Sequence, residues 1–282
     1  MILAYLALLR PTQWLKNAML FFPPFLAGQI LLPGIIPKGA LPFVALCLVS
    51  SAGYIVNDFL DRGRDMHHPV KRLRPIPSGA IGFPGALVLW AALMLGGLVL
   101  AAWSASSFRF TLLVLGYAAV SASYSCGLKN LPIVDIFCIS AGFLLRLQAG
   151  GELFRVPISP WLFLTVFLLA VFLSTGKRFS ESRSLGEVAG AHRVSLTQYP
   201  AGFLDGTLYM TGTAALVTYA MYTLNRGGLV YSVPLCLFGL LRYILRVTTG
   251  DGGDPTESLL KDRALFIVGL LWVLSVVWSI YL

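Results

Sequence analysis

The sequence predicts an all-α membrane protein with about nine spanning helices. Of its 282 residues, 57% are hydrophobic and only 12% are charged, whereas ordinary soluble domains carry about 25% charged residues. The mean hydropathy is +0.80. Since a helix needs about 20 apolar residues to cross a bilayer, the chain has room for about eight to ten spans and for no sizeable soluble domain. We therefore expect a single intramembrane domain over residues 1–282.

The apolar runs place the individual spans. Before them lies an amphipathic N-terminal stretch, in which Trp14 and Lys16 are of the kind that anchor a chain at the membrane interface. The expected spans are residues 17–34, 40–60, 83–103, 108–126, 132–151, 159–176, 203–223, 229–248 and 264–282. Gly and Pro interrupt several of these runs, and membrane helices tolerate both.

The charges of the loops orient these spans. The N-terminus and the loops after the second, fourth, sixth and eighth spans share one face, which holds most of the Lys and Arg residues. The opposite face holds only Lys38, Arg109, Arg155 and Arg226. Because basic residues gather on the cytoplasmic side, we expect the first face to be cytoplasmic, in a bacterial inner membrane. The net charge of +9 then belongs to membrane-side loops and does not indicate a nucleic-acid partner.

The densest polar stretch is residues 57–79, NDFLDRGRDMHHPVKRLRPIPSG. Asp58, Asp61 and Asp65 stand at i, i+3 and i+7, so they share one helical face. Their repulsion needs an offset, and Mg²⁺ suits it because Mg²⁺ takes oxygen ligands, often one or two carboxylates plus substrate phosphates. A solvated loop with paired charges is the alternative, but charge at membrane level is generally functional. We therefore predict a metal site here, with Asn57 beside it.

Basic residues follow the carboxylates. Lys71, Arg72 and Arg74 suit phosphate oxygens, and the prolines around them prevent one continuous helix. Carboxylates for a metal, followed by cations for phosphate, indicate a site for a pyrophosphate ester.

Three further polar segments fall on the same face as residues 57–79. They are residues 124–135, 176–193 and 250–263, and we expect one cytoplasm-facing site to draw on all four segments. In the last of them, Asp254 and Glu257 stand near the start of a short helical stretch, where capping of the helix is the simpler explanation.

The other two segments also have simpler explanations. Tyr124 and Lys129 close the fourth span, as an interfacial aromatic ring and a snorkelling lysine would. Lys177 and Arg178 close the sixth span, where two cations either bind phosphate or only set the topology.

Arg146 differs because it lies inside the fifth span. About eleven residues of helix precede it, or roughly 16 Å, which is too deep for easy snorkelling. An intramembrane arginine generally faces a polar cavity and has a partner. We expect an anionic group of the substrate or a carboxylate, with a structural ion pair as the alternative.

The pattern NDxxDxxxD over residues 57–65, closing a second transmembrane helix, resembles the first aspartate-rich motif of the UbiA superfamily. The resemblance implies about nine helices around a central cavity and a Mg²⁺ site. Typical members carry a second aspartate-rich motif after helix six, where this chain reads GKRFSE. Lys177 and Arg178 thus stand where carboxylates would be expected. This difference argues against a prenyl pyrophosphate donor held by two carboxylate clusters.

One branch of the superfamily resembles the chain nearly end to end. The segments are RPTQWLKN, NDFLDRGRDMHHPVKRLRPIPSG, YSCGLKNLPIVD, GFLLRLQAGG, GKRFSE and GDPTESLLKDR, and they look like those of the decaprenyl-phosphate phosphoribosyltransferases. That family transfers phosphoribose from phosphoribosyl pyrophosphate to a polyprenyl phosphate and releases pyrophosphate, towards lipid-linked arabinose donors for cell-wall polymers. The resemblance implies a Mg²⁺-dependent glycosyltransferase.

The resemblance also implies roles for residues of this chain. Asp58 and Asp61, with Asp65, would hold Mg²⁺ on the donor pyrophosphate, and Asp58, Asp61, Lys177 and Tyr124 are the expected catalytic residues. The expected substrate contacts are Lys16, Asn17, Asn57, Lys71, Arg72, Arg74, Tyr124, Lys129, Arg146, Lys177 and Arg178. An apolar cavity would take the isoprenoid tail.

Two alternative functions remain open from the sequence. A UbiA-type prenyltransferase would move a prenyl group onto an aromatic acceptor, although the GKRFSE segment argues against that donor. A transporter of lipid phosphates would also need charge at one face, but transporters usually contain inverted repeats, and the sequence has no evident repeat.

Overall fold

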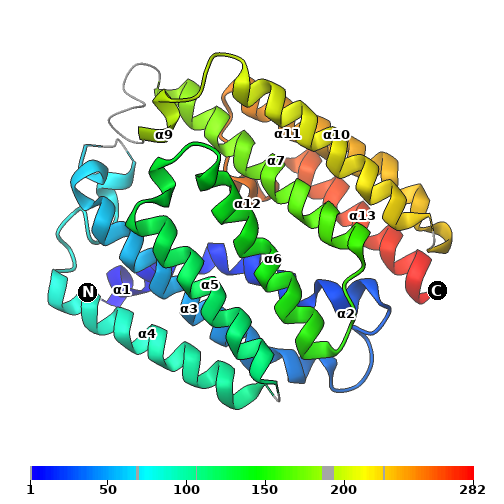
Figure 1. Cartoon of the computed structure of the whole chain (residues 1–282), viewed down its shortest axis with the longest axis horizontal. Helices are drawn as coiled ribbons and strands as arrows, with labels where there is room; N and C mark the ends of the chain where they lie inside the picture. The colour runs from blue at the N-terminus through cyan, green and yellow to red at the C-terminus, as the bar shows by residue number, and fades with distance from the viewer. Residues whose placement is uncertain (1, 68–69, 106, 186–193, 225) are drawn as a thin grey trace. The chain divides into compact units, whose positions relative to one another are not determined.

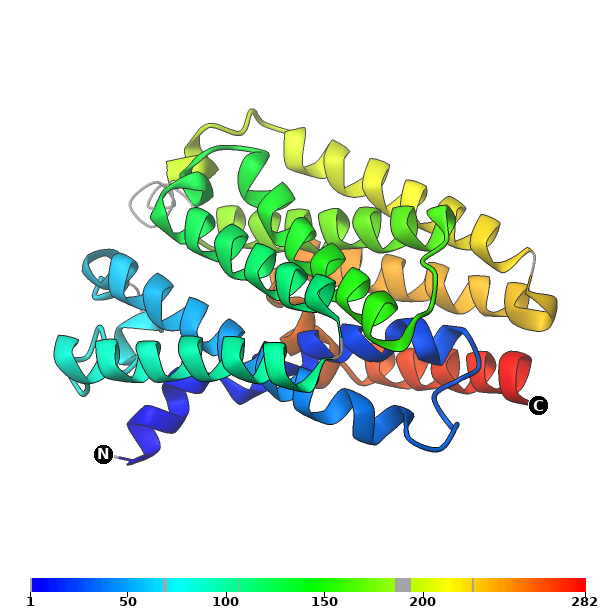
Figure 2. The same cartoon turned by 60° about the horizontal axis from the view of Figure 1, so that its bottom comes forward.

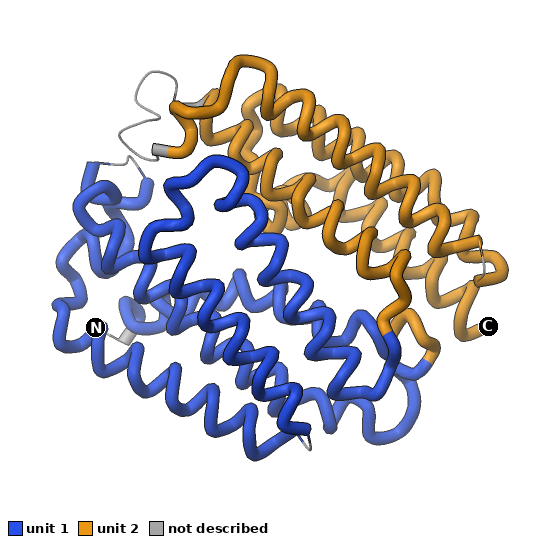
Figure 3. The backbone as a smooth tube through the Cα atoms, in the orientation of Figure 1, with its two compact units in different colours: residues 1–24, 29–157 blue, residues 25–28, 158–282 orange. Residues whose placement is uncertain are grey.

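The computed structural model describes residues 2–67, 70–105, 107–185, 194–224 and 226–282. Across these ranges the chain is helical and contains no strand (Figure 1 and, from a second direction, Figure 2), so the predicted all-α class is confirmed. His68 and Pro69 of the polar segment 57–79, and Arg193 of the polar segment 176–193, lie outside the described residues. The chain forms two compact units, which Figure 3 distinguishes by colour.

Unit 1 comprises residues 1–24 and 29–157. Its elements are α1 (Ile2–Leu9), η1 (Pro11–Phe21), the start of α2 (Phe22–Leu26), α3 (Ile35–Asp65), η2 (Lys71–Leu73), α4 (Phe83–Ser104), α5 (Phe108–Cys126), η3 (Leu128–Asn130) and α6 (Val134–Phe154). The η elements are 3₁₀ helices.

Unit 2 comprises residues 25–28 and 158–282. Its further elements are α7 (Pro160–Leu185), α9 (Val194–Thr197), α10 (Phe203–Thr223), η5 (Gly227–Ser232), α11 (Val233–Thr249), α12 (Pro255–Lys261) and α13 (Arg263–Tyr281). The single domain that the sequence predicts over residues 1–282 stays a prediction.

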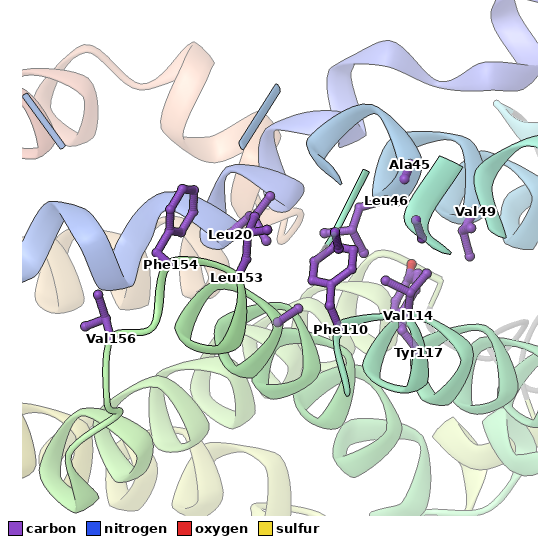
Figure 4. Close-up of a cluster of buried hydrophobic side chains, with 13 residues drawn as sticks. Leu20, Ala45, Leu46, Val49, Phe110, Val114, Tyr117, Leu153, Phe154 and Val156 are labelled. Carbon is purple, nitrogen blue, oxygen red and sulfur yellow. The ribbon is translucent and has the colours of Figure 1, made fainter. Parts of the chain in front are cut away.

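The core of unit 1 forms where α3 packs against α4 and α5, and where η1 packs against α6 and α3. Leu20 of η1, Leu46 and Val49 of α3, Phe110 of α5 and Phe154 of α6 belong to one buried cluster (Figure 4). Apolar side chains from segments far apart in the sequence thus hold η1, α5 and α6 against the long helix α3.

A second cluster in unit 1 anchors the loop after α3. Ile76 and Ile81 of that loop are buried with Leu8 of α1 and Ile55 of α3. The loop also closes on itself, because the Ile81 backbone N–H donates to the Pro75 carbonyl at 3.0 Å. The basic residues of the loop are therefore delivered to the end of α3 by a buried anchor.

In unit 2, α7 packs against α10 and α11, and α13 packs against α11 and α12. Phe172 and Phe179 of α7 are buried with Leu208 of α10 and with Tyr243 and Val247 of α11. This packing brings the C-terminal half of α7 next to the end of α11.

Six helical stretches are long and apolar enough to cross a membrane within the described part of the chain: 35–65, 83–104, 134–154, 160–183, 227–249 and 263–281. Two further predicted spans, 108–126 and 203–223, are the helices α5 and α10. The chain is an integral membrane protein.

The first predicted span, 17–34, is wrong as a single helix. The segment is instead the end of the 3₁₀ helix η1 and the five-residue helix α2, followed by turns. Pro23 and Pro24 lack the backbone N–H that a continuing helix would need. Gly28 after α2 and Gly34 before α3 adopt positive φ angles of 73° and 88°, which a continuous right-handed helix does not contain.

The helix α3 is longer than the predicted span 40–60, since it runs from Ile35 to Asp65. It contains Pro42, which membrane helices tolerate when neighbouring helices cover the interruption. The whole aspartate pattern consequently lies on one continuous helix, as the sequence predicts.

Candidate active site

Two carboxylates of α3 converge on one arginine of the anchored loop. Nη1 of Arg74 donates to Oδ1 of Asp58 and to Oδ2 of Asp65, at 2.9 Å each. The side chains of Asp58 and Asp65 are only 2% and 6% exposed, whereas that of Arg74 is 30% exposed. Burying two carboxylates costs free energy unless a cation compensates them, and the guanidinium of Arg74 supplies that charge.

Arg10 is a second cation on Asp58, which sequence reasoning did not single out. Its guanidinium donates to Oδ1 of Asp58 and lies 4.9 Å from the centre of the Tyr54 ring. The backbone of Arg10 is left-handed, with φ 50°, a conformation that costs a non-glycine residue about 1–2 kcal/mol. The turn is tied to α3 because the Ser51 hydroxyl donates to the Leu9 carbonyl at 2.7 Å.

Asp61 faces a different cation. Lys129, between α5 and α6, donates to Oδ1 of Asp61 at 2.6 Å and to Oδ1 of Asn57 at 3.2 Å. The side chain of Lys129 is only 6% exposed, so it is a buried ion-pair partner and does not snorkel to solvent. The two polar segments of unit 1 are thus joined directly, and Arg64 adds a bond to Asn130 at 3.3 Å.

The carboxylates that share Arg74 suit a divalent cation. Among the described residues, no group of three or more His, Cys, Asp and Glu side chains converges as a metal site. Asp58 and Asp65 nevertheless each direct one oxygen at the same cationic nitrogen. Two carboxylates completed by phosphate oxygens are a ligand set that Mg²⁺ accepts. Asp61 bonds Lys129 and not Arg74. Binding of a metal by Asp58, Asp61 and Asp65 together stays a prediction.

Arg146 is a buried hub of unit 1. Its Nε donates to Oδ1 of Asn17 at 2.7 Å, its Nη1 to the Gly142 carbonyl at 3.0 Å and its Nη2 to the Tyr117 hydroxyl at 2.8 Å. Asn17 in turn donates to the Ser50 hydroxyl at 3.2 Å. Within the described ranges these neutral partners take the place of the expected carboxylate, and binding of an anionic group of the substrate by Arg146 stays a prediction.

The other predicted substrate contacts of unit 1 are spread around this site. Lys71 lies 4.0 Å from Asp65, and Arg72 is exposed beside it on η2. Tyr124 is half-buried near the end of α5, and Lys16 is half-buried on η1. Binding of substrate by these residues stays a prediction.

In unit 2, the third and fourth polar segments meet at α7. Nζ of Lys177 donates to Oδ2 of Asp254 at 3.1 Å. The other oxygen of Asp254 accepts from the backbone N–H groups of Thr256 and Glu257 at 3.1 and 3.2 Å. Asp254 therefore caps α12, as expected, and also neutralises Lys177.

Close backbone packing makes this contact possible. A Cβ on Gly253 would lie 2.6 Å from Cβ of Ser180 and 2.9 Å from the Gly176 carbonyl oxygen. A Cβ on Gly176 would lie 2.5 Å from the ring of Tyr243, whose hydroxyl donates to the Gly253 carbonyl at 2.7 Å. The glycines of GKRFSE and GDGGD thus serve one close approach between α7 and the loop after α11.

Arg178 is buried, with a side chain 1% exposed. Its Nη1 donates to Oε2 of Glu181, one turn further along α7, at 2.5 Å. The charge of the guanidinium is therefore compensated by Glu181. Binding of phosphate by Lys177 and Arg178 stays a prediction.

Unit 2 also contains a buried aspartate, Asp262, which sequence reasoning missed. Asp262 accepts two-pronged hydrogen bonds from Arg242, one from Nη1 of Arg246 at 3.0 Å and one from the Leu265 backbone N–H at 2.9 Å. The hydrogen bonds from Arg242 hold the pKa of Asp262 well below its usual range, although burial opposes them. The spacing of Asp262 from the start of α13 was a capping signal that could have revealed it.

The multi-span helical fold and the carboxylate row that ends α3 define an integral membrane protein with an ionic site at the end of its long helix. The sequence matches the UbiA prenyltransferase family over residues 21–274. The chain therefore belongs to the UbiA prenyltransferase family.

Relatives and solved structures agree with this family. The chain is 34% identical to a decaprenyl-phosphate phosphoribosyltransferase of Corynebacterium glutamicum, over 97% of this chain and 86% of that one. It is 32% identical to the enzyme of the same name from Mycolicibacterium smegmatis, over 96% of this chain and 91% of that one. A UbiA homologue from Archaeoglobus fulgidus, solved with GPP and Mg²⁺, has the same fold, with a TM-score of 0.76 at 20% identity over 99% of this chain and 100% of that one.

Proposed function

We propose that this protein transfers 5-phosphoribose from phosphoribosyl pyrophosphate to a polyprenyl phosphate and releases pyrophosphate, at the cytoplasmic face of a bacterial inner membrane. The observation that carries the proposal is the similarity over 97% of the chain to a relative of that name. The ionic site supports it, because four basic side chains meet three carboxylates in unit 1. Such an excess of cations suits a donor with a pyrophosphate at C1 and a phosphate at C5.

The carboxylates of α3 would hold the metal. Asp58 and Asp65 would bind Mg²⁺, with Asp61 nearby on the same face of α3, and the bound ion would offset the negative charge that develops on the leaving pyrophosphate. Arg10, Arg74 and Lys129 would bind phosphate oxygens once their carboxylates are otherwise compensated, since charged hydrogen bonds to phosphate are strong.

The bond changes follow from the substrates. The bond between ribose C1 and the pyrophosphate oxygen breaks, and C1 acquires oxocarbenium character as the pyrophosphate leaves with the bonding electrons. An oxygen of the acceptor phosphate then forms the new bond to C1. Because this phosphate is already anionic, no strong general base is required, which agrees with an ionic site that is rich in arginine and lysine.

The test is product formation by the purified protein in lipid nanodiscs. We expect phosphoribosyl pyrophosphate labelled in the ribose to yield a labelled lipid with polyprenyl phosphates, together with one pyrophosphate per product. Parallel reactions with a prenyl pyrophosphate and 4-hydroxybenzoate, and transbilayer movement of a labelled polyprenyl phosphate, test the two other functions. Product only from the prenyl donor, or movement without any covalent product, would overturn the proposal.

A further inference from the structure

The position between Asp58 and Asp65 is filled by a cation that belongs to the chain. Both carboxylates direct an oxygen at Nη1 of Arg74, and both are almost fully buried. A divalent cation that binds the two carboxylates would need the same position. It would therefore compete with the guanidinium of Arg74 for the same two oxygens.

Arg74 is placed so that its guanidinium can leave while its backbone stays. The backbone is held by Ile76 and Ile81 in the buried cluster with α1 and α3, and the Arg74 carbonyl accepts from the Ser78 N–H at 2.9 Å. The side chain is 30% exposed, in contrast to the carboxylates that it covers. A long arginine side chain on an anchored loop can thus turn to a neighbouring phosphate without moving the loop.

The charges around the site make the exchange depend on an anion. Arg10, Lys71, Arg74 and Lys129 already exceed the three carboxylates by one positive charge. Adding a divalent cation alone would raise this excess and leave the displaced guanidinium without a carboxylate. A donor with phosphate groups removes both costs, because its oxygens bind the metal and the displaced arginine together.

We propose that Arg74 is the internal counter-ion of the metal site. Its guanidinium occupies the position between Asp58 and Asp65; it would yield that position to a divalent cation when the donor binds, and would then turn to a phosphate of the donor. The displacement of Arg74 by a divalent cation, the metal half of this proposal, rests only on the contacts of Arg74 with Asp58 and Asp65. The transfer of Arg74 to a phosphate, the donor half, rests on the proposed function. Arg74 thereby couples metal binding to donor binding.

The metal half is tested with Mn²⁺ alone, measured by electron paramagnetic resonance on the purified protein. Arg74→Gln removes the competing charge, so it should bind Mn²⁺ about tenfold to a hundredfold more tightly than the native protein, the worth of a charged hydrogen bond. Arg62→Gln is the matched control. It removes one charge from the same end of α3, but Arg62 is exposed and lies over the Phe59 ring at 4.7 Å.

The expected order is a large gain in Mn²⁺ affinity for Arg74→Gln and a small one for Arg62→Gln. Equal affinities in these two variants would overturn the inference. Arg10→Gln removes the other guanidinium from Asp58 and should also tighten Mn²⁺ binding. If Arg74→Gln does not fold, an unchanged affinity in Arg10→Gln overturns the inference in its place.

The donor half is tested by repeating the titrations with phosphoribosyl pyrophosphate and no acceptor. The donor should tighten Mn²⁺ binding in the native protein more than in Arg74→Gln, and an equal tightening in both overturns the transfer of Arg74 to the donor. If this donor changes Mn²⁺ binding in no variant while Arg74→Gln still tightens it, the metal half is supported and the proposed function fails. The two failures are therefore distinct.

Discussion

Asp58 in unit 1 and Asp262 in unit 2 are both buried aspartates that hold two arginines, yet their other contacts differ. Asp262 also accepts a backbone N–H at the start of α13, so part of its charge is compensated by the helix itself. In the described part of the chain, Asp58 contacts only the side chains of Arg10 and Arg74. Side chains can turn away from a carboxylate, whereas a capped helix end cannot. The comparison indicates an exchangeable carboxylate in unit 1 and a structural one in unit 2.

The largest effect expected from this difference is on activity. Asp58→Asn should lower kcat/KM about a hundredfold to a thousandfold, because it removes a charge that would hold the metal on the leaving group. Asp262→Asn should leave kcat nearly unchanged per folded molecule. The measurement is the initial rate of labelled lipid product in nanodiscs.

Asp205→Asn is the control for the activity measurement, because Asp205 stands in the first turn of α10 and belongs to neither ionic cluster. Native rates in Asp58→Asn, or full activity of the native protein in EDTA, would contradict the exchangeable role of Asp58 as a metal ligand.

The next effect concerns thermal stability, and here the larger loss of Tm is expected for the variant of Asp262 and the smaller one for the variant of Asp58. Asp262→Asn leaves Arg242 and the largely buried Arg246 without their carboxylate, and removing one partner of an ion pair leaves the other charge uncompensated. Thermal unfolding in detergent should therefore show a large loss of Tm for Asp262→Asn. A loss of Tm for Asp58→Asn that equals or exceeds it would mean that Asp58 is the structural residue.

A smaller loss is expected where the loop after α11 approaches α7. The Cβ added by Gly253→Ala would push backbone atoms of Gly176 and Lys177 away from residue 253. Overpacking of this kind typically costs about 1–3 kcal/mol. Gly206→Ala is the matched control in the same unit, because no described atom outside its own stretch of helix lies within 4 Å of its added Cβ. Equal Tm values for these two variants would show that the close approach contributes nothing to the stability of unit 2.

The smallest effect is a dependence on pH. The pKa of Asp262 is lowered, chiefly by the hydrogen bonds from Arg242, so its stabilisation is present above the unfolded pKa, about 3.9, and is lost as the pH falls through the folded value. The difference in Tm between the native protein and Asp262→Asn should stay constant from about pH 8 to pH 5 and shrink below about pH 4. A difference that already disappears near neutral pH would contradict this origin of the stabilisation.

The sequence by itself predicted the features that depend on neighbours along the chain. Hydropathy placed eight of the nine expected spans on helices, because about 20 apolar residues in a row are needed to cross a bilayer. The spacing of Asp58, Asp61 and Asp65 placed them on one helical face, because a helix has 3.6 residues per turn. Asp254 was expected to cap a helix and does so. The first span failed because Pro23, Pro24 and Gly28 broke a run that hydropathy alone reads as continuous.

The tertiary structure decided which charges meet. Arg10 lies 48 residues from Asp58, and Arg146 lies 129 residues from Asn17, so no local spacing could pair them. Packing of η1 and α6 against the other helices of unit 1 sets both contacts. The sequence showed that carboxylates and cations share one end of the membrane helices, but only the packing showed that Arg74 stands between Asp58 and Asp65. An ion pair needs distances of a few ångströms, and in this chain those distances depend on contacts between segments far apart in sequence.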